Sequence, residues 1–205
     1  SSSSTFKITF SCESAIYFHM QYGTSSEGTY DKLTVVLDER TFTCSGTVSS
    51  FDFVELQPGE HVLTLTYSKD GSGSSGSDQV WVASLKLTDM ETGIPVIGLA
   101  APGQLGEEAI AQFGTLPKVD VLRLKGSLNK EDWTTIKNMT YLCYLDMSET
   151  TVTEIPAEAF TNTSIRTIKW PANLKVIGGK AFYNKYLRGH LVLPETLDSI
   201  GPSAF

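Results

Sequence analysis

The amino-acid sequence predicts a mainly β protein of two domains, in which an N-terminal β-sandwich or jelly roll precedes a C-terminal solenoid of repeats with short capping helices. Two observations support this prediction. In the first half, apolar residues alternate with polar ones, as in strands that bury one face. In the second half, an apolar pair recurs every 23 residues, and a fixed period in the twenties is typical of stacked repeats that each contribute one strand.

Residues 6–90 are expected to form the sandwich, after a flexible leader of residues 1–5. Phe6, Ile8 and Phe10 show the alternation of apolar and polar residues most clearly. About seven short runs of this kind are separated by turns rich in Gly, Ser and Pro, which is typical of sandwiches and jelly rolls.

Residues 91–103 contain several Gly and Pro breakers and are expected to link the two domains. The repeat domain then covers residues 104–205, and it is expected to be truncated at its C-terminus because the last repeat is incomplete. A short helix at about 104–114 would cover the open end of the solenoid. Asn129 is a candidate N-cap for a second helix.

Two apolar positions of each repeat should face the core, and the residue between them should point outward. The inward pairs are Leu122 and Leu124, Leu145 and Met147, Ile168 and Trp170, and Leu191 and Leu193. Because neighbouring strands lie about 4.8 Å apart, Arg123, Asp146 and Lys169 should form a ladder of alternating charge on the exposed face. The candidate partner-binding residues on this face are Arg123, Tyr144, Asp146, Lys169 and His190. The alternative is a solvated ladder of weak surface ion pairs.

The repeats also carry a longer motif. Trp170-Pro-Ala-Asn-Leu-Lys-Val-Ile-Gly-Gly-Lys-Ala-Phe182 recurs as Leu193-Pro-Glu-Thr-Leu-Asp-Ser-Ile-Gly-Pro-Ser-Ala-Phe205. Over about residues 116–205 the chain closely resembles the BspA-like leucine-rich repeats of surface proteins from Bacteroides-type bacteria. One departure is that Ile155 is followed by Pro156 instead of Gly. The resemblance implies attachment at the cell surface to host matrix proteins, other bacteria or host cells.

The first half resembles, more loosely, the jelly-roll modules of bacterial surface adhesins and hydrolases. The residues that carry this resemblance are Gly59-Glu-His-Val-Leu-Thr-Leu-Thr-Tyr-Ser-Lys-Asp70, Gly76-Ser-Asp78 and Trp81. The resemblance concerns the fold more than the function.

Two kinds of binding site can be considered in the sandwich. Tyr22 and Tyr30 lie beside a Gly/Ser loop and are candidates for stacking on sugar rings. Asp70 and Asp78 flank another Gly/Ser loop and are weak candidates for binding calcium, since carboxylates suit hard cations. The EF-hand pattern does not occur there, and the alternative is that these aspartates accept hydrogen bonds from turn amides.

The cysteines leave two interpretations open. Cys12 and Cys44 both fall in the sandwich, where they could form a disulfide across the sheets or remain two buried thiols. Cys143 has no evident partner and is expected to be structural. None of the three has the spacing of zinc ligands.

Charge and motifs exclude several classes of function. The formal net charge is −7 with no strongly basic segment, so nucleic acid is not an expected partner. No apolar run approaches the roughly 20 residues that span a bilayer, although the Ser-rich start is compatible with a lipid anchor upstream. Neither an enzyme nor a cofactor is expected, because the sequence lacks nucleophile-elbow, metalloprotease, P-loop and dinucleotide motifs.

These observations favour a non-enzymatic adhesion or ligand-binding protein at the outer surface of a bacterial cell. Its expected partner is an extracellular protein or glycan, bound by the strand face of the repeats and by sandwich loops. The alternative is a carbohydrate-binding module of a polysaccharide-uptake system, with the repeats as a spacer. A third interpretation is an accessory domain of an enzyme whose catalytic segment lies elsewhere.

Overall fold

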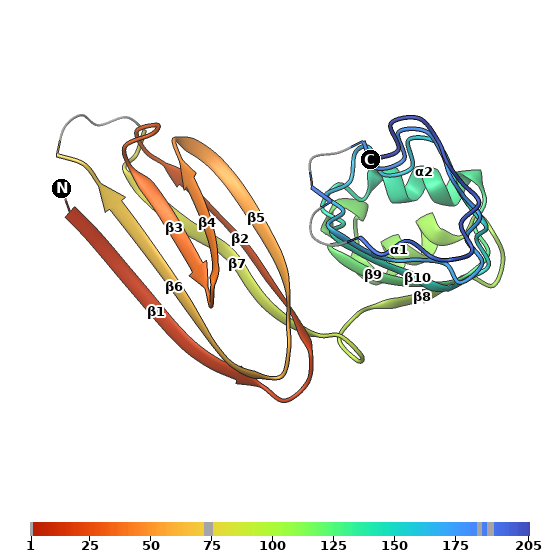
Figure 1. Ribbon diagram of the computed structural model, residues 1–205, viewed down its shortest axis with the longest axis horizontal. Helices are drawn as coiled ribbons and strands as arrows, with labels where there is room; N and C mark the ends of the chain where they lie inside the picture. Colours follow the sequence, from red (N-terminus) through yellow and green to blue (C-terminus); the bar gives the residue numbers. More distant parts are fainter. Residues whose placement is uncertain (1, 72–75, 184–185, 188–190) are drawn as a thin grey trace. The chain divides into compact units, whose positions relative to one another are not determined.

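The computed structural model describes residues 2–71, 76–183, 186–187 and 191–205. The chain divides into two compact units, Ser1–Gly93 and Ile94–Phe205 (Figure 1). Each unit has its own apolar core. Within the described residues, no helix is long and apolar enough to cross a membrane.

The first unit contains two antiparallel sheets. The described strands are β1 (Ser2–Cys12), β2 (Ile16–Ser25), β3 (Lys32–Leu37), β4 (Arg40–Ser45), β5 (Thr47–Leu56), β6 (Gly59–Lys69) and β7 (Gln79–Asp89). One sheet has the order β1-β6-β3-β4 and the other β5-β2-β7. The described residues of the first unit thus form seven strands, whereas a jelly roll has eight.

Alternation explains how the two sheets share one core. Phe18, Met20 and Tyr22 of β2 and Leu33 and Val35 of β3 alternate along their strands and pack in the same apolar cluster. No disulfide forms among the described residues, so Cys12, Cys44 and Cys143 all carry thiols. Of the two interpretations open for Cys12 and Cys44, the structure has free thiols, although both side chains are only partly buried.

The start of the chain differs from the expected flexible leader. Ser2–Thr5 belong to β1, where they pair with the end of β6 from Thr66 to Lys69. The Thr5 and Thr66 hydroxyl oxygens lie 3.2 Å apart and form a hydrogen bond across the two strands. Ser2–Thr5 are all polar, so their sequence shows no alternation that would indicate a strand. They are extended because they pair with the end of β6.

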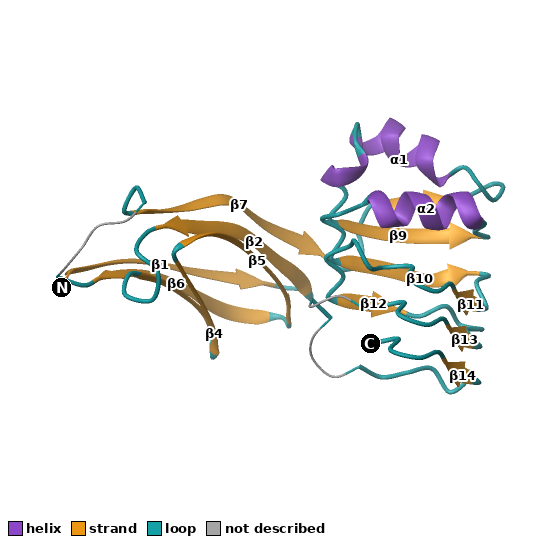
Figure 2. Cartoon of the chain, turned by 90° about the horizontal axis from the view of Figure 1, so that it is seen from above, coloured by secondary structure: helices purple, strands orange, loops and turns teal. Residues whose placement is uncertain are grey.

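The second unit is a stack of coils whose short strands form two parallel sheets (Figure 2). The first sheet contains β8 (Val96–Gly98), β9 (Val121–Gly126), β10 (Tyr144–Thr150) and β12 (Thr167–Lys169), in the order β12-β10-β9-β8. The second contains β11 (Glu154–Ile155), β13 (Val176–Ile177) and β14 (Ser199–Ile200). The helices are α1 (Leu105–Phe113) and α2 (Lys130–Asn138), with a 3₁₀ turn at Leu116–Lys118.

The 23-residue period matches the register of the first sheet. Leu122, Leu145 and Ile168 lie opposite one another in β9, β10 and β12, and all three are buried in one core. Trp170 lies just beyond β12 and packs edge-on against Phe182, with 5.7 Å between the ring centroids. Each inward side chain therefore covers its neighbours in the coils before and after, as expected of stacked repeats.

The predicted linker of residues 91–103 contains a strand. β8 pairs in parallel with β9, and Ile97, opposite Leu124, is buried in the core of the second unit. The breakers around Val96–Gly98 hide this strand in the sequence, because three residues are too few to show a period.

Both helices begin close to the positions expected from the sequence. Asn129 caps α2 by accepting hydrogen bonds from the backbone N–H groups of Glu131 and Asp132. The buried Asp132 carboxylate accepts from the backbone N–H groups of Gly103 and Leu105, at 2.7 and 3.0 Å. One side chain of α2 thus satisfies the start of α1, which has no side-chain cap of its own.

The tight turns of the later coils leave no room for a Cβ atom. A Cβ on Gly178 would lie 2.4 Å from the backbone nitrogen of Ala157, and one on Gly201 would lie 2.4 Å from that of Gly179. Each glycine therefore lets its coil approach the backbone of the coil before it.

Pro156 takes the place of this glycine in the first tight turn because its surroundings differ. Helix α2 stands beside it, and a cavity of about 550 Å³ lies between Pro156, Ala157 and the helix residues Trp133 and Lys137. A side chain at position 156 has space that positions 178 and 201 lack. The departure from the repeat motif thus marks the boundary between the helical coil and the tight coils.

Replacing either buried-turn glycine by alanine should destabilise the second unit. We expect Gly178→Ala and Gly201→Ala each to lower the free energy of unfolding by about 1–3 kcal/mol, because the backbone of the neighbouring coil must move. Gly98→Ala is the matched control, since nothing lies within 4 Å of a Cβ there, and it should change stability by less than about 0.5 kcal/mol. Urea unfolding of the second unit measures this, and equal stability of Gly178→Ala and Gly98→Ala would contradict the packing argument.

Candidate functional site

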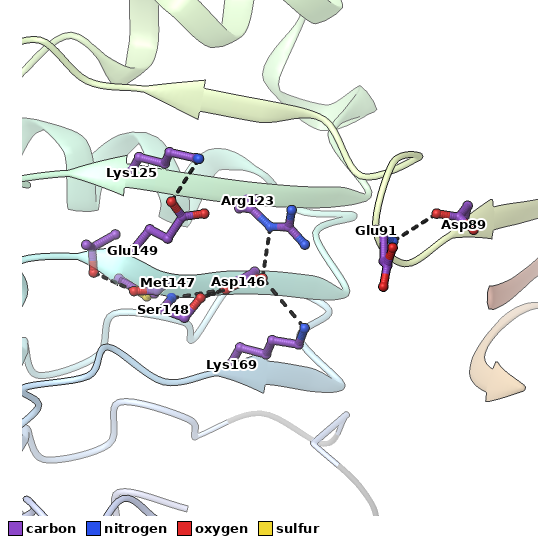
Figure 3. Close-up of polar contacts among 10 residues, drawn as sticks. Asp89, Glu91, Arg123, Lys125, Asp146, Met147, Ser148, Glu149 and Lys169 are labelled. Atoms are coloured by element: carbon purple, nitrogen blue, oxygen red, sulfur yellow. Dashed lines mark hydrogen bonds and ion pairs between the residues drawn. The ribbon is translucent and has the colours of Figure 1, made fainter. Parts of the chain in front are cut away.

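The exposed side of the first parallel sheet presents a continuous row of side chains. Val96, Arg123, Asp146 and Lys169 lie opposite one another in β8, β9, β10 and β12. Figure 3 shows Asp146 between the two cations. This row and the neighbouring pair Lys125 and Glu149 are called the charged strand face below.

Asp146 is the centre of the charged strand face. Its carboxylate accepts a hydrogen bond from Arg123 Nε at 3.0 Å, and Lys169 Nζ lies 3.8 Å away. The other carboxylate oxygen accepts from the backbone N–H of Ser148 at 3.0 Å and from its hydroxyl at 2.6 Å. Only 2% of Asp146 is exposed, so its partners replace the water that a carboxylate would otherwise bind.

These contacts set the pKa of the Asp146 carboxyl. Burial alone would raise this pKa, but the hydrogen bonds from Ser148 and Arg123 and the positive charge of Lys169 outweigh it. The pKa of Asp146 therefore lies below its usual value, and the side chain is ionised at neutral pH. The carboxylate acts as a fixed negative charge that orients two cations.

The second row of the charged strand face is an ion pair that the sequence did not indicate. Lys125 Nζ lies 2.8 Å from a carboxylate oxygen of Glu149, and both side chains are about half exposed. The 23-residue period would place Ser148 opposite Lys125. An extra residue in β10 after Asp146 shifts the register and brings Glu149 there instead.

The structure brings together three of the five predicted partner-binding residues. Arg123, Asp146 and Lys169 form the predicted ladder of alternating charge. Tyr144 precedes them in β10 but is fully buried, so it offers no contact surface, contrary to expectation. His190 lies outside the described residues.

Exposure differs greatly along the ladder. Lys169 keeps 45% of its side chain exposed, whereas Arg123 keeps 19%. Ion pairs as exposed as that of Lys169 are worth about 0–1 kcal/mol. Lys169 is therefore held less firmly by Asp146 than Arg123 is.

The two predicted sugar-stacking residues have different surroundings. Tyr22 is buried in the core of the first unit, because β2 continues beyond Met20 and places Tyr22 on the same inward face as Phe18. The prediction of an exposed Tyr22 is therefore wrong. Tyr30 lies in the turn after β2 and is 62% exposed.

The two calcium candidates take part in protein contacts. Asp78 forms an ion pair with Lys69, and the backbone N–H of Asp70 donates a hydrogen bond to Asp31 at 3.0 Å. In the part of the chain that the structure describes, no three His, Cys, Asp or Glu side chains are grouped to hold a metal ion.

In a comparison with protein families, one family model matches part of the chain. Residues 115–205 match, in six copies, a family model described as the BspA type leucine rich repeat region. The predicted resemblance of the repeats is thereby confirmed, and the matched segment includes all strands from β9 to β14. A search among curated proteins found no match to the chain.

Replacing the central carboxylate should have a pH-dependent cost. We expect Asp146→Asn to lower the free energy of unfolding by about 1–3 kcal/mol at neutral pH, because Arg123 loses a charged acceptor. A carboxyl whose pKa is lowered by folding stabilises above its unfolded pKa of about 3.9. The difference between the parent and the variant should therefore shrink as the pH falls below about 4.

Urea unfolding across this pH range measures the difference. Lys169→Met is the matched control, since its more distant and exposed pair should contribute less than about 1 kcal/mol. A stability difference for Asp146→Asn that stays constant with pH would contradict the assignment.

Proposed function

We propose that the protein is a non-enzymatic surface protein of a bacterium, and that it binds an extracellular protein or glycan through the charged strand face. The family match supports an interaction role, since repeats of this type are associated with surface proteins. We interpret the second unit as a leucine-rich repeat solenoid and the first as a β-sandwich module. Nucleic acid and a cofactor are not part of this proposal, and a lipid anchor upstream would be compatible with it.

The single observation that carries the proposal is the arrangement of exposed cations on rigid strands. Lys169 and Lys125 project from β12 and β9, whose backbones are held by hydrogen bonds to β10. A partner would not have to order these strands on binding, which lowers the entropic cost of association.

Charge favours a partner with acidic groups. The charged strand face contains three cations, Arg123, Lys125 and Lys169, and two anions, Asp146 and Glu149, giving it a net charge of +1 (3 − 2). The whole chain has a net charge of −7. An acidic protein segment or an acidic glycan would therefore be repelled by much of the molecule and attracted here, which orients its approach.

Reversing the exposed cations should weaken partner binding. We expect the double variant Lys125→Glu and Lys169→Glu to lose about tenfold or more in affinity for a bound matrix protein or glycan, mainly through slower association. The affinity of the unaltered protein should also fall with added salt. Lys175→Glu is the matched control, because Lys175 is half exposed in the same repeat region outside the charged strand face.

Arrays of matrix proteins and glycans, followed by surface plasmon resonance on each hit, provide the measurement. Equal binding by the double variant and the control, for every hit, would rule out the charged strand face as the binding site.

The carbohydrate-binding alternative depends on Tyr30, since Tyr22 is buried. If the first unit holds a sugar site, Tyr30→Ala should weaken the free energy of glycan binding by about 1–3 kcal/mol. Stacking of a nucleic-acid base on one aromatic side chain has this order of magnitude. The free energy of unfolding should not change, because the Tyr30 side chain is exposed. Glycan binding that survives Tyr30→Ala but not the double lysine variant would support the charged strand face instead.

A further inference from the structure

The first unit has an apolar cleft that neither its fold nor the proposed function explains. A cavity of about 580 Å³ opens between the two sheets, along the side formed by β1 and β7. Its lining is largely aliphatic and aromatic, and includes Phe6, Met20, Leu65, Val82 and Leu85.

One wall of the cleft is an inward strand face without a cover. Val82, Leu85 and Leu87 of β7 lie directly opposite three core residues of β2, so they share the inner face of their sheet. Yet all three are exposed, with 43% of Leu85 accessible to solvent. Inner-face residues at this level of exposure are unusual, because folding normally buries that side of a sheet.

The opposite wall of the cleft, formed by β1, also exposes apolar side chains on the inner face of its sheet. Phe6 and Ile8 of β1 lie opposite Leu65 and Leu63 of β6, and therefore also face the other sheet. Leu63 is buried, whereas Phe6 is 59% exposed. The two edge strands thus expose apolar side chains on both sides of one opening, forming the kind of patch that marks an interaction site.

The two sheets differ in width at this opening. The sheet of β1 has four strands, while that of β7 has three, and β7 is its last described strand. At the other side of the unit, β4 and β5 are joined directly by the turn at Gly46. One strand beside β7 would make the sheets equal in width and would cover the exposed inner residues.

Part of the β7 edge is regular enough to pair with another strand. A bulge at Ala83 interrupts the register with β2, whereas Ser84–Asp89 pair without interruption. Leu85 and Leu87 point inward along this segment, and the exposed Lys86 lies between them on the outer face. A strand added here would have every second residue facing the cleft.

We propose that Ser84–Asp89 of β7 accept an extended segment of a partner protein, in which apolar residues alternate with polar ones and an acidic residue lies opposite Lys86. The added strand forms backbone hydrogen bonds with the edge of β7, as in other cases of strand addition. Its apolar side chains fill the cleft beside Leu85 and Phe6. Its acidic residue forms a cross-strand pair with Lys86.

Charge argues against a second copy of the chain as the occupant. Two copies that met through this edge in the register centred on Lys86 would bring their Lys86 side chains together, and a lysine on an edge strand disfavours such pairing. The lining argues against a glycan, because aliphatic side chains offer few hydrogen-bonding groups to sugar hydroxyls.

The test uses the full chain and labelled peptides of about seven residues, which match the length of the regular edge. The first peptide alternates Val and Glu, the second alternates Val and Lys, and the third is the first with a central Pro that removes a backbone donor. Fluorescence anisotropy measures binding, and amide hydrogen exchange locates it. We expect the Val/Glu peptide to bind about tenfold more tightly than either control and to protect the amides of Ser84–Asp89.

A charge swap makes the proposal specific. Lys86→Glu should reverse the preference, so that the Val/Lys peptide binds more tightly than the Val/Glu peptide. Lys7→Glu is the matched control, since this exposed lysine lies on the other edge strand, and it should leave the order unchanged. Lys169→Glu should also leave it unchanged, which separates this site from the charged strand face.

Three outcomes would overturn the proposal. They are absence of Val/Glu binding at about 1 mM peptide, equal binding of all three peptides, and protection confined to strands other than β7. The first of these outcomes, together with binding of dodecanoate to the cleft, would assign the cleft to a small apolar ligand.

Discussion

The second unit depends on how closely each coil can approach the backbone of the coil before it. Gly178 and Gly201 permit this approach, since a Cβ at either position would collide with a backbone nitrogen. The close approach brings Phe160 and Phe182 into a stack with 4.7 Å between their ring centroids, and it keeps the parallel strands in register. In these later coils, one geometric constraint therefore supports both the apolar core and the register of β11, β13 and β14.

The charged strand face follows from the parallel pairing of β9, β10 and β12 in the first sheet. Strand register places Arg123, Asp146 and Lys169 in one row, and the buried carboxylate then holds the two cations at different strengths. Arg123 and Ser148 offset the cost of burying Asp146, whereas Lys169 lies farther from it and stays more exposed than Arg123. A surface of this kind combines a hydrogen-bonded strand support with a few exposed charges.

The first unit follows a different principle, because its two sheets close on one side and remain open on the other. Alternation along β2 and β3 builds a shared core, and the short turn at Gly46 brings β4 next to β5. At the other side, β1 and β7 are edge strands whose inner faces are only partly covered. The bulge at Ala83 and the charge of Lys86 limit which strands could pair there, so the same features restrict aggregation and select a partner.

The sequence by itself determined the mainly β class, the repeat period, the inward position of Leu122, Leu145 and Ile168, and the charge ladder, because each of these follows from local periodicity. Only the tertiary structure decided that Ser2–Thr5 and Val96–Gly98 are strands, since their hydrogen-bond partners lie far away in the chain. It also decided that Tyr22 and Tyr144 are buried and that Glu149 meets Lys125, through a bulge that shifts the expected register by one residue. Periodicity reports which face a residue occupies, whereas pairing and burial depend on which distant strands cover that face.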